Sequence, residues 1–356
     1  MKNIFDLDTH PYSYDKNNKL KAMIEGLNIL TKHHMDNCNE YRDIVLKVFH
    51  FEQQVDNLRD FPFFPVNLFK HVDLKSIDDS EVFKVLLSSG TSSQIQSKIY
   101  LDSNTSIQQK QALFNTVNPI IGSKRLPMII IDNKNVIRDR ATYNARGAGI
   151  LGFSIFGRDH FYLLDDQMNV NWDGLYAYLN KHKNEKILLF GFTYIVWRYF
   201  YREFSKQNKE IDLSNSILIH GGGWKKLLNE EVKKSVFNNS LYQTFGMKKI
   251  INYYGMIEQI GSVFFECENG FLHAPNYADL LIRDPISFEI LPNRKKGVLQ
   301  VFSLLPFSYP GHSLLTEDLG EIVGEDDCMC GKKGKYFNVY GRLPSAEVRG
   351  CSDTQP

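Results

Sequence analysis

Ser and Thr side chains gather around residue 90, in a stretch that separates two short apolar runs. Leu86 and Leu87 end the first run and Ile99 begins the second, which predicts a strand, a loop and a strand. The loop residues that could bind an anion are Ser88, Ser89, Gly90, Thr91, Ser92, Ser93 and Lys98. Hydroxyls, a glycine free to take a positive φ and a cation suit an oxyanion, so a phosphate is the natural ligand. An ordinary polar hairpin explains the same residues, and no second glycine precedes Lys98 as in the Gly-Lys-Ser/Thr nucleotide loop.

Two turns further along the chain each follow a short apolar run, at 217–219 and at 250–253. A turn rich in glycine lets a ligand approach the backbone closely, because no side chain intervenes. The second turn also brings a carboxylate just past a strand end. The residues concerned are Gly221, Gly222, Gly223, Tyr254, Gly255 and Glu258. Taken alone, each of these sequences is just as often a simple turn without a role in binding.

A third and a fourth turn carry charged side chains. Asp318 lies in Thr316-Glu317-Asp318-Leu319-Gly320, and Arg342 follows Gly341. A carboxylate in such a turn can accept hydrogen bonds from a vicinal diol, and a guanidinium can bind an anion through two parallel hydrogen bonds. The four turns in this order suggest a nucleotide site more strongly than any one of them does.

The elements that would position these turns alternate along the chain. Apolar runs of strand length, rich in β-branched residues, occur at 128–131, 187–190, 217–219, 250–253 and 298–304. Stretches of helical period separate several of them, at 172–179 and 194–204, and two amphipathic helices are predicted around 20–30 and 41–48. This alternation indicates an α/β class with at least partly parallel sheets, in which ligands bind at the carboxyl ends of strands.

Composition narrows the classes of function. The 356 residues are 43% hydrophobic, and 42 Lys and Arg balance 41 Asp and Glu, which argues against a nucleic-acid binder. We expect no membrane span, because no stretch approaches the roughly 18 apolar residues that a spanning helix needs. The polar N-terminus indicates a cytoplasmic protein. Five unevenly spread cysteines make a disulfide framework improbable in so large a chain.

The ordered motifs resemble the signature of the adenylate-forming superfamily of acyl and aryl ligases, and more distantly phenylacetate–CoA ligase. They are Ser88-Ser89-Gly90-Thr91, Tyr254-Gly255-Met256-Ile257-Glu258, Thr316-Glu317-Asp318 and Gly341-Arg342. Three further stretches resemble the acyl-protein synthetase (LuxE-like) branch, which serves the bacterial luminescence fatty-acid reductase complex. These are His220-Gly221-Gly222-Gly223-Trp224-Lys225, Ser308-Tyr309-Pro310-Gly311-His312-Ser313 and Glu347-Val348-Arg349-Gly350-Cys351-Ser352.

The resemblance implies a fold and roles for residues. The expected fold is the large domain of adenylate-forming enzymes, with stacked mixed sheets, flanking helices and a small β subdomain. We expect one domain, with N-terminal helices over 1–60, a nucleotide-binding core over 61–260 and a β-rich part over 261–356. Residues 88 to 98 would hold the β/γ-phosphates of ATP, Glu258 a Mg²⁺ ion, Gly221 to Gly223 the adenine and Asp318 the ribose hydroxyls. Arg342 would lie near ribose or phosphate.

Two departures from the ligase pattern affect these expectations. The loop reads Thr91-Ser92-Ser93-Gln94 where many ligases have Thr-Thr-Gly followed by Pro-Lys, so the cradle is longer. The chain also ends fourteen residues after Arg342, without the mobile C-terminal domain that brings a catalytic Lys in those enzymes. In the acyl-protein synthetase family a cysteine close to the C-terminus receives the acyl group, and Cys351 matches that position. Arg349 beside it would favour the thiolate.

A second constellation consists of cysteines and one histidine. Five residues separate Cys267 from His273, and one residue separates Cys328 from Cys330. Three thiols and an imidazole in two turns could form a structural Cys₃His zinc site, although Cys-x-Cys is tighter than the usual spacing. Small buried thiols without a metal are an equal alternative, and a strained Cys328–Cys330 disulfide is a weaker one.

Three functions remain open from the sequence. The first is an ATP- and Mg²⁺-dependent ligase that activates a fatty or aryl carboxylic acid to an acyl-AMP and forms a thioester on Cys351 or on a partner such as an acyl reductase. The second is a ligase that passes the acyl group to coenzyme A or a carrier protein, with a missing domain supplied in trans. The third is a non-catalytic nucleotide- or acyl-binding partner in a complex.

Overall fold

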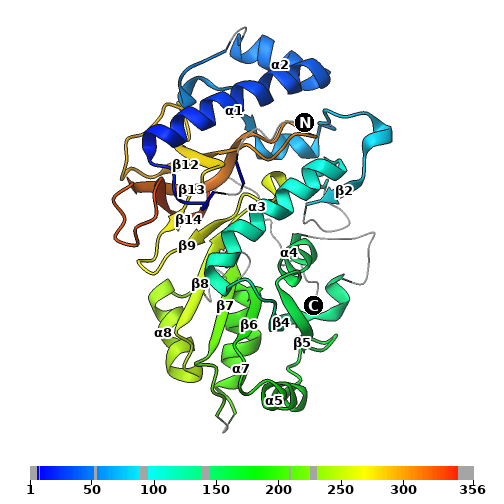
Figure 1. The fold of residues 1–356 in the computed structure, drawn as a ribbon, viewed down its shortest axis with the longest axis vertical. Coiled ribbons are helices and arrows are strands. Elements are labelled where there is room, and N and C mark those ends of the chain that lie inside the picture. The colour runs from blue at the N-terminus through cyan, green and yellow to red at the C-terminus, as the bar shows by residue number, and fades with distance from the viewer. Residues whose placement is uncertain are drawn as a thin grey trace. The chain divides into compact units, whose positions relative to one another are not determined.

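The computed structural model describes residues 6–7, 9–51, 54–88, 95–137, 145–207, 210–224 and 231–343, and its helices and strands form two compact units (Figure 1). One unit contains the described residues of 1–88, 95–118 and 254–343, and the other those of 119–253. The division expected from the sequence, a single domain of three successive parts, stays a prediction. No helix among the described residues is long and apolar enough to cross a bilayer.

The first unit begins with helices and short turns. Its helices are α1 (Lys16–Asn37), α2 (Asn39–Phe49) and α3 (Ser103–Ile121), of which α3 continues past the unit's last residue, 118. Short 3₁₀ turns and strands lie between them: η1 (Leu58–Asp60), β1 (Phe64–Pro65), η2 (Val66–Lys70), η3 (Asp79–Glu81), β2 (Lys84–Leu87) and β3 (Lys98–Leu101). Strands β2 and β3 pair antiparallel, which confirms the strands predicted on both sides of the hydroxyl-rich loop.

The rest of the first unit is a sheet with antiparallel neighbours in the order β11-β12-β13-β14-β10-β9. Its strands are β9 (Phe264–Glu266), β10 (Leu272–His273), β11 (Ala278–Arg283), β12 (Gly297–Ser303), β13 (Ser313–Glu325) and β14 (Lys335–Arg342), and η7 (Ile257–Gln259) precedes them. Strand β1 pairs in parallel with β13, with Phe64 opposite Leu314. All six strands fall within the part of the chain expected to be rich in β structure.

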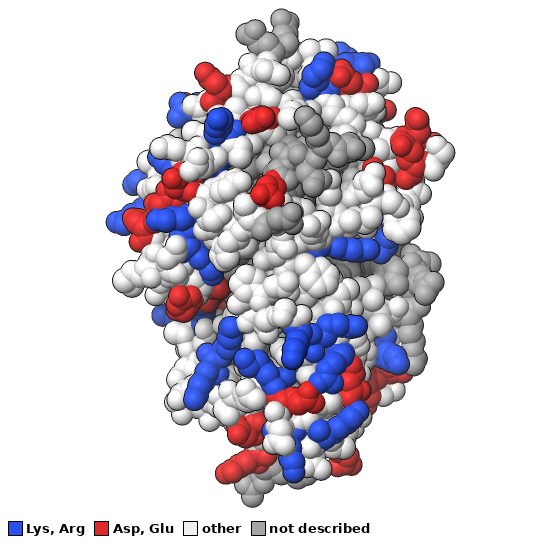
Figure 2. Space-filling view, viewed as in Figure 1, with Lys and Arg blue, Asp and Glu red and all other residues white. Residues whose placement is uncertain are grey.

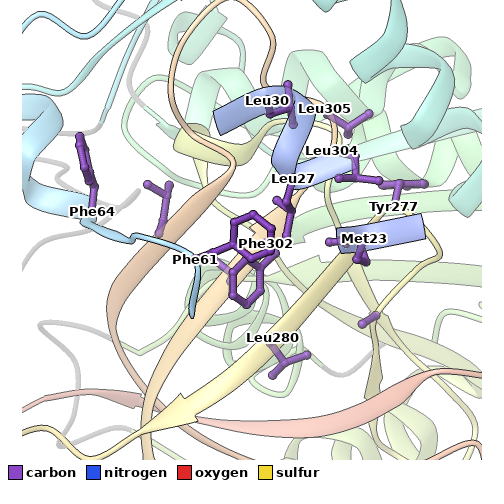
Figure 3. Packing of buried hydrophobic residues seen from close by; sticks show 14 of the residues in the cluster. Met23, Leu27, Leu30, Phe61, Phe64, Tyr277, Leu280, Phe302, Leu304 and Leu305 are labelled. Atoms are coloured by element: carbon purple, nitrogen blue, oxygen red, sulfur yellow. The ribbon is translucent and has the colours of Figure 1, made fainter. Parts of the chain in front are cut away.

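The apolar core of this unit lies between α1 and the sheet (Figure 3). Met23, Leu27 and Leu30 recur every three or four residues on α1 and are fully buried, because that spacing places them on one face of a helix. They belong to one cluster with Phe302 of β12 and Phe61. Burial of each large apolar side chain contributes roughly 1.5–3 kcal/mol, so this face anchors α1 to the sheet.

The second unit is a five-stranded sheet in the order β8-β7-β6-β4-β5, and every pair in it is parallel. Its strands are β4 (Leu126–Asn133), β5 (Gly157–Leu164), β6 (Ile187–Phe192), β7 (Ser216–Gly221) and β8 (Lys249–Tyr254). Between them lie η4 (Lys134–Ile137), α4 (Ala145–Ser154), α5 (Trp172–Lys181), α6 (Thr193–Ile195), the π-helix η5 (Val196–Tyr201), α7 (Arg202–Phe204) and α8 (Lys234–Phe245). The parallel α/β alternation predicted from the apolar runs is confirmed.

Charged side chains are distributed differently at the surface and in the interior of this unit. On the face seen in Figure 2, Lys and Arg are interspersed with Asp and Glu, and ion pairs such as Lys181–Asp159, at 2.6 Å, lie on the surface. Arg146 of α4 is instead fully buried, and its Nε donates to Asp132 Oδ2 at 2.7 Å. Because a buried charge without a partner is very unfavourable, this pair holds the start of α4 against the end of β4.

Two stacked histidines join α1 to the loop before β13 in the first unit. The rings of His34 and His312 lie 4.9 Å apart. His34 Nδ1 shares a hydrogen bond with Ser76 Oγ at 2.8 Å, and His312 Nε2 lies 3.1 Å from Thr31 Oγ1 and 3.2 Å from Tyr41 OH. Burial lowers the pKa of His312 to about 3 and, together with the neighbouring imidazoles, lowers that of His34 well below its usual range. Both rings are therefore neutral at physiological pH.

This pair makes folding sensitive to acid. The unfolded chain binds protons on both imidazoles below a pKa of about 6.5 and the folded chain does not, so stability is full above pH 6.5 and falls as the pH drops. We expect the free energy of unfolding to fall by up to about 1.4 kcal/mol per pH unit for each buried histidine. His312→Gln should remove one such contribution, measured by urea unfolding between pH 5 and pH 8. The exposed His71→Gln is the matched control. If the free energy of unfolding of His312→Gln depends on pH as steeply as that of the wild type, the prediction is wrong.

Candidate functional site

Glu258 lies in the short turn η7, which hydrogen bonds tie to the sheet of the first unit. The side chain of the next residue, Gln259, donates through Nε2 to the carbonyl of Gly311 at 2.8 Å and to that of Val301 at 3.2 Å. A side chain at Gly311 would come within 2.7 Å of the Glu258 carbonyl, so glycine is required for this close approach. The turn is thus fixed from two directions, and the Glu258 carboxyl group has a defined place.

The environment of Glu258 disfavours its charge. The residue is only 7% exposed, and burial raises its pKa to about 7. The Ser97 hydroxyl and the Arg342 guanidinium oppose this rise, whereas the nearby Asp318 carboxylate adds to it. A buried carboxyl group with a carboxylate nearby is a good ligand for a hard cation, because the cation restores the balance of charge.

Asp318 is held by three hydrogen bonds in series. The hydroxyl of Tyr254 donates to Asp318 Oδ2 at 2.7 Å, and the backbone N–H of Asp318 donates to Thr316 Oγ1 at 3.1 Å. Thr316 in turn donates to the carbonyl of Leu299 on β12 at 3.0 Å. Burial raises the pKa of Tyr254, and the Asp318 charge raises it further, so the phenol keeps its proton. The Asp318 carboxylate is therefore held in one orientation.

Arg342 lies directly across the β13–β14 ribbon from Asp318, because the two are register partners. Its Nε is 3.8 Å from Asp318 Oδ1, and its guanidinium is 3.9 Å from Glu317 Oε2. The side chain remains 39% exposed. These pairs are long, and a guanidinium in this position is suited to bind an anionic ligand through parallel hydrogen bonds.

Of the residues expected to bind phosphate, the structure describes the two ends of the loop. Ser88 and Ser97 pair across it: the Ser88 N–H donates to the Ser97 carbonyl at 3.0 Å, and the Ser97 N–H donates to Ser88 Oγ at 2.8 Å. Lys98 is exposed and lies 3.2 Å from Asp73 Oδ1. The remaining predicted residues, Ser89, Gly90, Thr91, Ser92 and Ser93, lie outside the described residues.

The structure thus brings together Tyr254, Glu258, Asp318 and Arg342, and Ser97, which pairs with Ser88, lies near Glu258. Gly255, also predicted here, is exposed beside this group. The sequence reasoning missed Ser97, Thr316 and Gln259 as positioning residues. Gln259 is 1% exposed and Ser97 is fully buried. The one signal in the sequence for a positioning residue was Gln259, a polar residue directly beside the motif carboxylate Glu258.

The triple glycine belongs to the second unit and ends β7. A Cβ at Gly221 would lie 2.5 Å from the ring of Tyr253, and Gly222 has a φ of +78°. A Cβ at Gly223 would meet nothing within 4 Å. Gly222 and Gly223 are exposed, so a flat ligand could lie directly against their backbone. The following Lys225 lies outside the described residues, as does the predicted acyl acceptor Cys351.

Cys267, His273, Cys328 and Cys330 converge in the first unit, with all four ligand atoms within 4.8 Å of one another. Cys267 Sγ lies 3.9 Å from Cys328 Sγ, and Cys330 Sγ lies 3.3 Å from His273 Nε2. Ligands at tetrahedral zinc are separated by about 3.6–3.8 Å, given Zn–S and Zn–N bonds near 2.3 and 2.0 Å. The four described cysteines, which include this cluster and Cys38, are free thiols.

The protonation states of this cluster also suit a cation. Burial lowers the pKa of His273 to about 3, so the imidazole is neutral and able to ligate. Burial raises the pKa of Cys330 to about 12, and the neighbouring thiols Cys328 and Cys267 raise it further. Three thiols this close cannot all become thiolates without a cation between them, and a divalent metal ion would supply that charge.

The comparison that decides the family is the match of a model for the acyl-protein synthetase LuxE, which covers residues 2–355. The chain belongs to this family. It is 25% identical over 330 residues to the long-chain-fatty-acid–luciferin-component ligase of Vibrio harveyi, covering 90% of this chain and 84% of that protein. The corresponding ligase of Aliivibrio fischeri is 23% identical over 327 residues, with the same shares of the two chains covered.

Solved structures agree on the fold. A crystal structure of 2-hydroxyisobutyryl-CoA ligase in the postadenylation state, in complex with 2-HIB-AMP, has a TM-score of 0.71 at 15% identity. The alignment covers 96% of this chain and 75% of that one. An open conformation of the same ligase with 2-HIB-AMP and CoA gives a TM-score of 0.69, with 97% and 83% covered. The fold predicted for adenylate-forming ligases is therefore confirmed.

Membership of the LuxE family decides among the three functions in favour of an enzyme. The chain is an AMP-forming acid–thiol ligase of the acyl-protein synthetase type, which activates a carboxylic acid through an acyl-adenylate and transfers the acyl group to a thiol. ATP, with Mg²⁺, is the cosubstrate of such ligases. A purely binding role is excluded by the family, whereas the acid, the acceptor and the residue roles are matters of proposal.

Proposed function

We propose that this LuxE-family enzyme activates a long-chain fatty acid with the side chains of Tyr254, Glu258, Asp318 and Arg342. The observation that carries the proposal is the convergence of two carboxyl groups and a guanidinium, with Asp318 held at 2.7 Å by the Tyr254 hydroxyl. The two luciferin-component ligases carry the acid class in their names. An aryl acid is the alternative substrate.

Each residue has one task in this proposal. Asp318 accepts hydrogen bonds from the ribose diol, because the Tyr254 hydroxyl holds its carboxyl group in place. Arg342 binds the α-phosphate region through its guanidinium. Ser88, with Ser89 to Ser93 and Lys98, cradles the β- and γ-phosphates, and Gly221 to Gly223 line the adenine. Glu258 holds Mg²⁺, which neutralises phosphate charge when it is bound.

The reaction follows in two half-reactions. A carboxylate oxygen of the acid attacks the α-phosphorus of ATP, the bond to the β-phosphate oxygen breaks, and pyrophosphate leaves. A thiolate then attacks the acyl carbonyl carbon, and AMP leaves with the electron pair of the broken C–O bond. This chain's residues position the reactants and neutralise charge in the first step.

The acceptor of the second step is proposed to be the thiol of Cys351. The position of Cys351 near the C-terminus, like that of the acyl-accepting cysteine in the family, supports this proposal, and the neighbouring Arg349 would favour its thiolate. The acyl group would then pass to an acyl-reductase partner. Coenzyme A or a carrier-protein thiol is the alternative acceptor.

Acid-dependent exchange of pyrophosphate into ATP tests the first half-reaction. We expect fatty acids of increasing length to support exchange, and Glu258→Gln to lower its rate about 100-fold or more, because the metal loses its charged ligand. Glu25→Gln, which removes an exposed carboxylate on α1, should leave the rate within about twofold of wild type. Absence of exchange with every fatty and aryl acid would refute the proposal.

Mass spectrometry tests the acceptor. After incubation with ATP, Mg²⁺ and the best acid, we expect a hydroxylamine-sensitive acyl adduct on the peptide that contains Cys351. Cys351→Ser should abolish this thioester and leave pyrophosphate exchange unchanged, because adenylation precedes transfer. Cys38→Ser, at a buried thiol on another element, is the control. Thioester that still forms on the protein in Cys351→Ser, or rapid release onto free coenzyme A, would assign the acceptor elsewhere.

We further propose that Cys267, His273, Cys328 and Cys330 bind one structural Zn²⁺ ion. The support is the four-ligand geometry described above. The ion would join the β9–β10 hairpin to the turn between β13 and β14, and so brace the ribbon that carries Asp318 and Arg342.

Metal analysis tests the zinc site. Protein purified without chelator should contain about one zinc per chain, and Cys328→Ser should lose most of it, because three ligands bind far less tightly than four. Cys38→Ser should retain the metal. Removal of zinc should lower the thermal midpoint by several degrees. Wild-type protein that contains no zinc would contradict the site.

A further inference from the structure

Thr193 and His220 form a buried hydrogen-bonded pair at the carboxyl ends of neighbouring parallel strands. Thr193 follows β6 and His220 lies near the end of β7, where Phe192 and Gly221 are register partners. Thr193 Oγ1 is 2.9 Å from His220 Nδ1 and 3.1 Å from the carbonyl oxygen of Gly221. Thr193 is 8% exposed and His220 5%. The pair therefore lies directly beneath the triple-glycine turn.

The direction of both hydrogen bonds follows from their chemistry. A carbonyl oxygen can only accept, so the single hydroxyl hydrogen of Thr193 is donated to Gly221. The Thr193 oxygen must then accept from His220, so Nδ1 carries the imidazole proton. Burial lowers the pKa of His220 to about 3, and the ring is neutral, with one N–H. The result is a relay of two hydrogen bonds: His220 donates to Thr193, and Thr193 donates to the Gly221 carbonyl.

The hydrogen bond that holds the Gly221 carbonyl also sets the direction of the Gly222 N–H, because both belong to the same peptide group. The carbonyl and N–H of a trans peptide point in opposite directions, and the described residues contain no cis peptide. If Thr193 holds the Gly221 carbonyl on the interior side, the N–H of Gly222 points to the other side. Gly222 is exposed and has a φ of +78°. Without side chains at 222 and 223, a ligand can reach this N–H.

Packing keeps the relay rigid. The His220 ring lies 4.8 Å from the ring of Phe237. A Cβ at Gly221 would lie 2.5 Å from Tyr253, and one at Gly222 would lie 3.2 Å from Phe192, so the turn is confined on both sides. A peptide flip at Gly221–Gly222 would leave the buried Thr193 hydroxyl without its acceptor, which is unfavourable.

We propose that the Thr193–His220 pair orients the Gly221–Gly222 peptide so that the Gly222 N–H donates to a ring nitrogen of the bound adenine. The inference rests on the proposed placement of ATP at the triple glycine. Thr193 and His220 are positioning residues, because they act through the backbone and do not touch the base. Thr193 orients the peptide through the hydrogen bonds of its hydroxyl and not through the volume of its side chain.

Three variants separate hydrogen bonding from packing. Thr193→Val keeps the shape and removes both hydrogen bonds, Thr193→Ser keeps the hydroxyl, and Thr116→Val changes another buried threonine, in α3. Calorimetry gives the affinity for ATP without any need for catalysis, and exchange kinetics gives KM for ATP and for the acid. If Thr193→Val is unstable, His220→Leu, which removes the donor to Thr193, provides the same comparison.

We expect Thr193→Val to weaken ATP binding and raise its KM about 3- to 10-fold, the effect of one misaligned hydrogen bond. The KM for the acid should stay within about twofold, and Thr193→Ser and Thr116→Val should bind ATP like the wild type. Unchanged ATP affinity in Thr193→Val and His220→Leu, or a rise in the KM for the acid alone, would overturn the inference. This result can be told apart from failure of the proposed function, because in that case the wild type itself would show no pyrophosphate exchange.

Discussion

The site depends on a carboxyl group placed where its charge is unfavourable. Glu258 is buried, with the Asp318 carboxylate nearby and its own pKa raised to about 7. Such a group is stable only if the surrounding backbone holds it firmly and if a cation or a guanidinium compensates it. Gln259 and Gly311 supply the first condition. Arg342 supplies part of the second, and the remainder suits the metal ion of an ATP-dependent ligase.

The β13–β14 ribbon connects two sites of different chemistry. Asp318 and Arg342 face each other at one end of the ribbon, and the turn between the strands carries Cys328 and Cys330. Strand β14 also pairs with β10, which bears His273 opposite Tyr336. Because β13 also pairs with β12, the two strands are part of a larger sheet, which fixes the place at which the two charged side chains meet.

The two units hold their ligand-binding groups in different ways. In the first unit, side chains carry the chemistry, and hydrogen bonds from Tyr254 and Thr316 orient them. In the second, the backbone of Gly221 and Gly222 is the proposed binding surface, and the Thr193 hydroxyl holds the Gly221 carbonyl. Side-chain carboxylates suit diols and cations, whereas backbone N–H groups suit the acceptor nitrogens of a flat base.

Residue order along the chain was enough to predict the class of ligand and most of the elements. Apolar runs of strand length, separated by helical periods, indicated the parallel sheet, because burial on both faces leaves that pattern in sequence. Short motifs such as Thr316-Glu317-Asp318 survive in sequence because the functional atoms lie within a few residues of one another. What only the tertiary structure decided was which distant groups meet. Ser97 beside Glu258, Thr193 beneath Gly221 and the convergence of Cys267 with Cys328 depend on strand register and burial, and pairing across a sheet leaves no trace in local spacing.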